Sequence, residues 1–120
     1  MNQLIISVIL LLLIDSVFLY SISTLFKRQI MDVQGSPMQI NILGVTLCYL
    51  FLILGLYYFI IKPHRSVKDA FILGLVVYGV YETTTYALLK KWRLQTVMID
   101  TLWGGILFAL TTYLTYKLRS

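Results

Sequence analysis

Four long apolar runs, separated by short polar segments, constrain this chain more than any other feature. The runs cover residues 4–22, 40–61, 70–89 and 97–116. Each has about the 20 residues that an α-helix needs to cross a hydrocarbon core of about 30 Å. Backbone groups in lipid must pair within their own segment, which favours helices. The sequence therefore predicts an all-α fold, an integral membrane bundle of four transmembrane helices.

The composition agrees with a multi-pass membrane location, and the chain length indicates a single domain. Only 12% of the residues are charged and 59% are hydrophobic, whereas about a quarter of the residues in a soluble domain are charged. The length of 120 residues suits one domain, so we expect residues 1–120 to form a single four-helix transmembrane domain. Lys and Arg at span ends contact lipid phosphates. We therefore assign the net charge of +5 to contact with a lipid bilayer and expect no nucleic-acid partner.

The connecting segments contain the turn and capping signals. Residues 23–39 are rich in polar residues and include a turn signal at residues 34–37, so a polar loop is expected there. Ser66, followed three residues later by Asp69, resembles a capping box at the start of the third helix. Residues 90–93 form a very short connection. The last two helices are therefore expected to be antiparallel neighbours.

The first run also has an alternative interpretation as a cleaved signal peptide, because residues 21–23 resemble a small-residue cleavage site. Against this, the run is long, no Lys or Arg precedes it, and it contains Asp15. We therefore expect it to remain as a membrane span.

The basic residues favour neither orientation in the membrane. With four spans, one face of the membrane carries Lys62, Arg65, Lys68, Lys117 and Arg119, and the opposite face carries Lys27, Arg28, Lys90, Lys91 and Arg93. The positive-inside rule compares exactly such loops, and here both faces have the same number of basic residues. Dual insertion, or an orientation fixed by something other than charge, is expected.

Three of the five acidic residues lie inside the apolar runs: Asp15 in the first, Glu82 in the third and Asp100 near the start of the fourth. An Asp at mid-span costs about 2.5–3.5 kcal/mol on insertion scales, so these side chains should face the interior of the bundle. Because successive helices alternate in direction, all three positions fall in the same half of the membrane. The sequence therefore predicts one polar interior site.

Neighbours at helical spacing extend this candidate site. On the third run, three polar residues share a face with Glu82, and on the fourth run an aromatic residue lies one turn after Asp100. The predicted substrate- or proton-binding residues are Glu82, Asp100, Asp15, Tyr78, Thr85, Tyr86 and Trp103.

Two interpretations of the acids stay open. As functional groups, they bind a cation or carry a proton in a polar pocket. As structural groups, they hydrogen-bond helices together, with about 0.6–2 kcal/mol per contact. For Asp100 a third role exists, because an acid in the first turn of a helix complements the helix dipole.

The motifs that contain these residues resemble a family of small predicted membrane proteins, catalogued as domain of unknown function 2177. The resemblance rests on Asp15 and Phe18, on Lys62-Pro63, on Tyr78-Gly79-Val80-Tyr81-Glu82-x-Thr84-Thr85 and on Asp100-x-x-Trp103-Gly104. It implies the four-helix fold and a functional cluster at the acids, and it implies no activity. The family pattern more usually has Trp at Phe18, Asp at Glu82 and Asn at Thr85, so a ligand geometry tuned to Asp and Asn does not carry over unchanged.

The predicted function is proton- or cation-coupled transport or permeation of a small solute through the polar site. Four short helices enclose little volume, so we expect a homo-oligomer or a membrane-protein partner. The alternative is a non-catalytic scaffold or assembly subunit in which the acids only join helices. A third hypothesis is a lipid-modifying enzyme with Glu82 or Asp100 as general acid or base. An enzyme is not expected, because the sequence shows no activated nucleophile and no metal-ligand set. The single cysteine, Cys48, forms neither an intrachain disulfide nor a zinc site, and no cofactor is expected.

Overall fold

The computed structural model describes residues 2–35 and 41–118, and within these ranges all regular structure is helical. The elements are α1 (Gln3–Ser21), α2 (Ser23–Gln34), α3 (Ile42–Leu56), the π-helical turn η1 (Tyr57–Ile61), α4 (Val67–Leu88) and α5 (Leu94–Leu118). Four helices are long and apolar enough to cross a membrane, namely α1, α3 with η1, α4 and α5. The predicted all-α bundle of four transmembrane helices is confirmed. Ile40, the predicted start of the second span, and the basic Arg119 lie outside the described residues.

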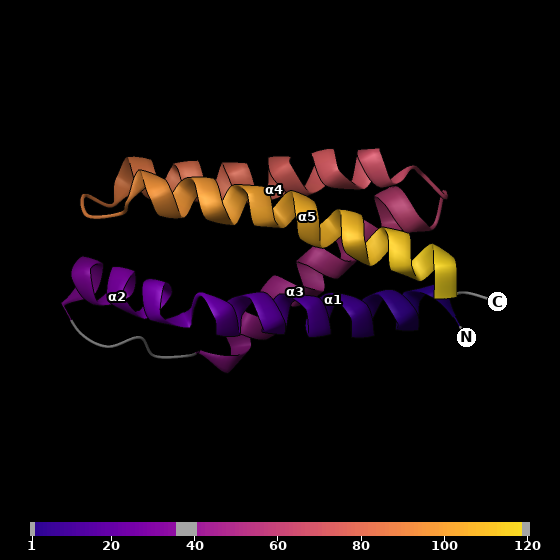
Figure 1. Cartoon of the computed structure of the whole chain (residues 1–120), viewed down its shortest axis with the longest axis horizontal. Helices are drawn as coiled ribbons and strands as arrows, with labels where there is room; N and C mark the ends of the chain where they lie inside the picture. Colours follow the sequence, from indigo (N-terminus) through magenta and orange to yellow (C-terminus); the bar gives the residue numbers. More distant parts are fainter. Residues whose placement is uncertain (1, 36–40, 119–120) are drawn as a thin grey trace.

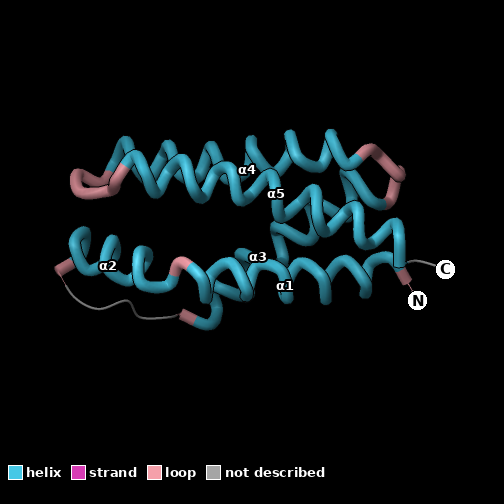
Figure 2. The backbone as a smooth tube through the Cα atoms, in the orientation of Figure 1, coloured by secondary structure: helices cyan, strands magenta, loops and turns pink. Residues whose placement is uncertain are grey.

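Helices α4 and α5 form an antiparallel hairpin along one side of the bundle (Figures 1 and 2), as the short connection predicted. Glycines allow these two helices to approach closely. A Cβ added to Gly74 would lie 2.2 Å from the carbonyl oxygen of Gly104, and a Cβ added to Gly104 would lie 2.3 Å from the ring of Tyr78. Small residues at such contacts let backbones pack in a membrane, where no hydrophobic effect drives helices together. Helix α5 also packs on α1.

The prediction of a polar loop over residues 23–39 was wrong for residues 23–34, which form helix α2. Its sequence contains no Gly or Pro before Gly35, and its apolar residues recur at helical spacing, so it forms a helix despite its charged residues. Gly35 ends the helix in the left-handed conformation (φ 72°), and its N–H donates to the carbonyl of Met31 at 2.8 Å. The rest of the expected turn, residues 36–37, lies outside the described residues. In Figure 1, α2 continues the line of α1 and lies opposite the turn between α4 and α5.

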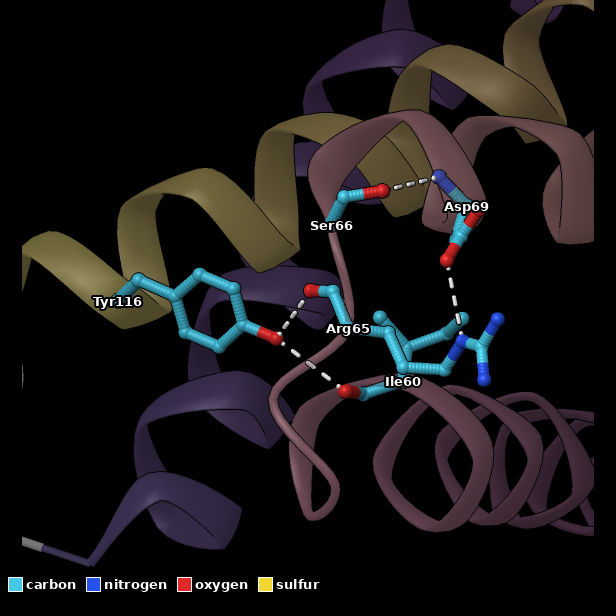
Figure 3. A network of polar contacts seen from close by, with 5 residues as sticks. All are labelled: Ile60, Arg65, Ser66, Asp69 and Tyr116. Atoms are coloured by element: carbon cyan, nitrogen blue, oxygen red, sulfur yellow. Dashed lines mark hydrogen bonds and ion pairs between the residues drawn. The ribbon is translucent and has the colours of Figure 1, made fainter.

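The loop between η1 and α4 is anchored at the other end of the bundle (Figure 3). The hydroxyl of Tyr116 lies 2.7 Å from the carbonyl oxygen of Arg65 and 3.2 Å from that of Ile60. Ser66 caps α4, because its hydroxyl oxygen accepts a hydrogen bond from the N–H of Asp69 at 3.1 Å, as predicted. These contacts fix the start of α4, the helix that carries Glu82.

Candidate functional site

A cavity of about 560 Å³, partly open to the surface of the bundle, lies between α1, α2, α3, α4 and α5. All three intramembrane acids line it: Asp15 from α1, Glu82 from α4 and Asp100 from α5. They are nearly inaccessible, with 6%, 0% and 8% of their surface exposed. The bundle therefore brings together the three carboxyl groups that the sequence placed at a common depth.

Both oxygens of Asp15 accept hydrogen bonds. The indole N–H of Trp103, on α5, donates to Oδ1 at 2.9 Å, and the hydroxyl of Tyr49, on α3, donates to Oδ2. The ring of Phe18 stacks on the indole of Trp103, with centroids 4.2 Å apart and planes 5° apart. Asp15 therefore joins α1 to α3 and α5, which is the structural role that the sequence left open.

Glu82 has a different environment. Its Oε1 accepts a hydrogen bond from the indole N–H of Trp92 at 2.9 Å, but its Oε2 is buried and has no hydrogen-bond partner among the described residues. Asp100, from α5, lines the same cavity as Glu82, and the two carboxyl groups interact electrostatically. Two like charges close together in a low-dielectric site repel each other, so the pair is suited to sharing a proton.

No basic side chain neutralises these acids within residues 2–35 and 41–118. The two ion pairs found there join Arg65 to Asp69 at 3.0 Å and Arg93 to Asp32 at 3.1 Å, and both involve partly exposed side chains. In the same ranges, no three His, Cys, Asp or Glu side chains are grouped so that they could hold a metal ion. The negative charge of the carboxyl groups must therefore be compensated by protons, by hydrogen-bond donors or by a bound ligand.

Trp92 is held in place from α2. The side chain of Gln29 is 1% exposed; its Nε2 donates to the carbonyl of Lys91 at 2.8 Å. Its Oε1 accepts from the N–H of Arg93 at 2.9 Å and from the hydroxyl of Thr96 at 3.0 Å. These bonds fix the two residues on either side of Trp92. Helix α2 therefore sets the position of the indole that binds Glu82.

The predicted site residues do not all reach the cavity. Tyr78 lines it, and Trp103 contributes through Asp15. The hydroxyl of Thr85 instead donates to the carbonyl of Tyr81 at 2.9 Å within α4, and Tyr86 is 47% exposed. Neither of these two lines the cavity.

Sequence reasoning missed three contributors. Trp92, Tyr49 and Gln29 are absent from the predicted site. For Tyr49 a signal existed, since it is a polar aromatic residue at the middle of an apolar run rather than at its end. For Trp92 the available signal was its place on the short connection that directly follows the helix of Glu82.

Comparison with known proteins gives the family and nothing finer. A family model described as predicted membrane protein (DUF2177) matches residues 1–117. No curated protein and no solved structure matches the chain. Together with the four helices able to span a bilayer, the match shows that this chain is an integral, multi-pass membrane protein and belongs to the DUF2177 family.

Proposed function

We propose that the protein carries out proton- or cation-coupled transport of a small solute, with the Glu82–Asp100 carboxyl pair as the coupling site. One observation carries the proposal. Oε2 of Glu82, a residue with no exposed surface, has no hydrogen-bond partner among the described residues, although it belongs to a side chain that lines a cavity. A buried acceptor without a partner costs roughly 1–3 kcal/mol. A proton, a water molecule or a ligand in the cavity supplies the missing donor.

The contrast with Asp15 supports a functional role for the pair. In a carboxyl group that only joins helices, both oxygens accept hydrogen bonds from neighbouring helices. Asp15 is such a group, because each of its oxygens accepts one. Glu82 accepts one hydrogen bond, from Trp92, and its second oxygen has no partner among the described residues, while a second acid, Asp100, lines the same cavity. Ionisable groups in a membrane interior that face a cavity are typical of proton relays and substrate pathways.

The alternative function is a scaffold or assembly subunit, and the bonding of Asp15 favours it. In addition, α3 contributes only Leu52 and Leu56 to the buried residues, so most of its apolar surface is available to lipid or to another protein. We propose that a second copy of the chain or another membrane protein packs there in either case. Transport is the main proposal because a scaffold has no use for an unpartnered carboxyl oxygen.

The test compares proton flux through the wild-type protein and a matched pair of variants. Purified protein is reconstituted into vesicles loaded with a pH-sensitive dye, and a pH gradient is imposed while potassium and valinomycin clamp the membrane potential. Wild-type protein is expected to dissipate the gradient faster than protein-free vesicles. Glu82→Gln keeps an oxygen for the Trp92 indole but cannot exchange a proton, so its rate should fall to that of protein-free vesicles.

Asp69→Asn is the control, because Asp69 is a partly exposed acid in the first turn of α4, ion-paired to Arg65 and outside the cavity lining. It should retain the wild-type rate. A wild-type rate equal to that of protein-free vesicles would contradict transport and favour the scaffold.

A further inference from the structure

We propose that the cavity binds an organic ammonium ion with an apolar body, whose N–H group hydrogen-bonds to Glu82. This inference rests on the proposed function and names the class of ligand that the coupling site takes.

The charge of the cavity wall selects a cation. Asp15, Glu82 and Asp100 line the cavity, and among the residues that the structure describes no Lys, Arg or His lines it. Lining groups of one sign in a low-dielectric surrounding attract the opposite charge and exclude their own. An anionic solute would meet three acids without a compensating base.

The shape and the aromatic residues of the wall favour an organic ion over a bare metal ion. Phe26, Tyr49, Phe51, Tyr78 and Tyr81 contribute rings to the lining. Ammonium groups are attracted to the faces of such rings, whereas hard metal cations require a shell of about six or more oxygen ligands. A volume of about 560 Å³ lies within the range of about 300–1,000 Å³ that is typical for small organic ligands.

The hydrogen-bonding state of Glu82 favours an ammonium ion that still carries N–H groups. Oε2 of Glu82 lacks a donor, and an ammonium N–H supplies one together with a positive charge. Binding of the cation displaces one proton from the Glu82–Asp100 pair. One proton leaves for each cation bound, so the net charge of the site is unchanged. The other titratable groups that face this pair are Asp15 from α1, Cys48 and Tyr49 from α3, and Tyr78 and Tyr81 from α4.

A binding experiment tests the proposal with two probes of the same shape. The probes are 4-phenylbutylamine, protonated at neutral pH, and 4-phenylbutan-1-ol, which has no charge. Trp92 and Trp103 are the two tryptophans of the chain, and each donates to a carboxyl group of the cavity. Their fluorescence therefore reports binding in the purified, detergent-solubilised protein. We expect the amine to bind about tenfold or more tightly than the alcohol and to release about one proton per bound molecule into weakly buffered solution.

Three variants sharpen the test. Glu82→Gln should abolish both the preference for the amine and the proton release. Tyr81→Leu removes one ring from the wall at a residue that is 61% exposed, so the fold is expected to survive while amine affinity falls several-fold. Tyr113→Leu alters an exposed tyrosine of α5 outside the cavity lining and should bind like the wild type.

Equal binding of amine and alcohol by the wild-type protein, or unchanged amine binding by Glu82→Gln, would overturn the proposal. The outcome is separable from that of the flux experiment. Selective amine binding without proton flux would leave the ligand class standing and overturn transport. Flux without a preference for the amine would overturn the ligand class alone.

Discussion

The indole nitrogen of Trp92 lies 2.9 Å from Oε1 of Glu82 and donates a hydrogen bond to it. This bond connects the α4–α5 turn, at one end of the bundle, to a carboxyl group within a membrane span. The second oxygen of Glu82 has no hydrogen-bond partner among the described residues. A change in the position of the turn would therefore change the hydrogen bonding of Glu82 in the candidate site.

Replacing Trp92 by Phe should destabilise the protein. The ring volume is largely kept, but Oε1 of Glu82 loses its donor, so both oxygens of a fully buried side chain are left without a donor. The expected loss is about 1–3 kcal/mol, measured as a lower unfolding temperature of the detergent-solubilised protein. Glu82→Gln retains an oxygen for the indole and should be affected less. Equal melting temperatures for Trp92→Phe and the wild type would show that this bond contributes no net stability.

Helix α2 should detach from the turn when Gln29 is replaced by Leu. The substitution leaves the carbonyl of Lys91, the N–H of Arg93 and the hydroxyl of Thr96 without their common partner. The ion pair from Arg93 to Asp32 is partly exposed and contributes about 1 kcal/mol at most, so it cannot hold α2 alone. Faster amide hydrogen exchange is expected throughout α2. Lys27→Gln, at an exposed position of the same helix, is the control and should exchange at the wild-type rate.

The spans and the depth of the acids were predictable from sequence because they depend on local quantities. An apolar run of sufficient length must be helical in lipid, and a carboxyl group within it must avoid lipid. These arguments place Asp15, Glu82 and Asp100 in one half of the membrane. They need no information on how the helices pack.

The partners of the acids were not predictable in the same way. Tyr49 reaches Asp15 across 34 positions of sequence, and Trp103 reaches it across 88. Such contacts depend on the rotation and register of separate helices, which hydropathy does not encode. Thr85 illustrates the limit, because it shares a helical stripe with Glu82 but bonds within α4. Helix α2 was missed for a different reason: its charges indicated a loop, although its apolar spacing is helical.

The close approach of α4 and α5 should make Gly74 intolerant of a side chain. A Cβ at Gly74 would lie 2.2 Å from the carbonyl oxygen of Gly104, a backbone atom that cannot move without separating the helices. Gly74→Ala is expected to cost about 1–3 kcal/mol or more, as overpacking generally does, seen as a lower unfolding temperature. Gly55→Ala provides the matched control, because nothing lies within 4 Å of a Cβ there. An unchanged melting temperature for Gly74→Ala would contradict the close packing of this hairpin.

The two kinds of carboxyl group in the cavity should respond differently to the same chemical change. Asp15→Asn keeps one carbonyl oxygen for the indole of Trp103, and its new amide group can donate to the hydroxyl oxygen of Tyr49. The links from α1 to α5 and α3 are therefore expected to survive, with folding and proton flux close to those of the wild type. Glu82→Gln also keeps its fold, through the bond to Trp92, but it removes the group that exchanges a proton with Asp100.

Both variants are measured in the same vesicle assay, alongside Asp15→Leu. This third variant removes both acceptors from the indole and the hydroxyl, and it should unfold at a lower temperature than Asp15→Asn. The decisive comparison is the flux of Asp15→Asn against that of Glu82→Gln. If Asp15→Asn abolishes flux while its melting temperature is unchanged, Asp15 itself takes part in proton transfer. The division between a structural acid on α1 and a functional pair on α4 and α5 would then be wrong.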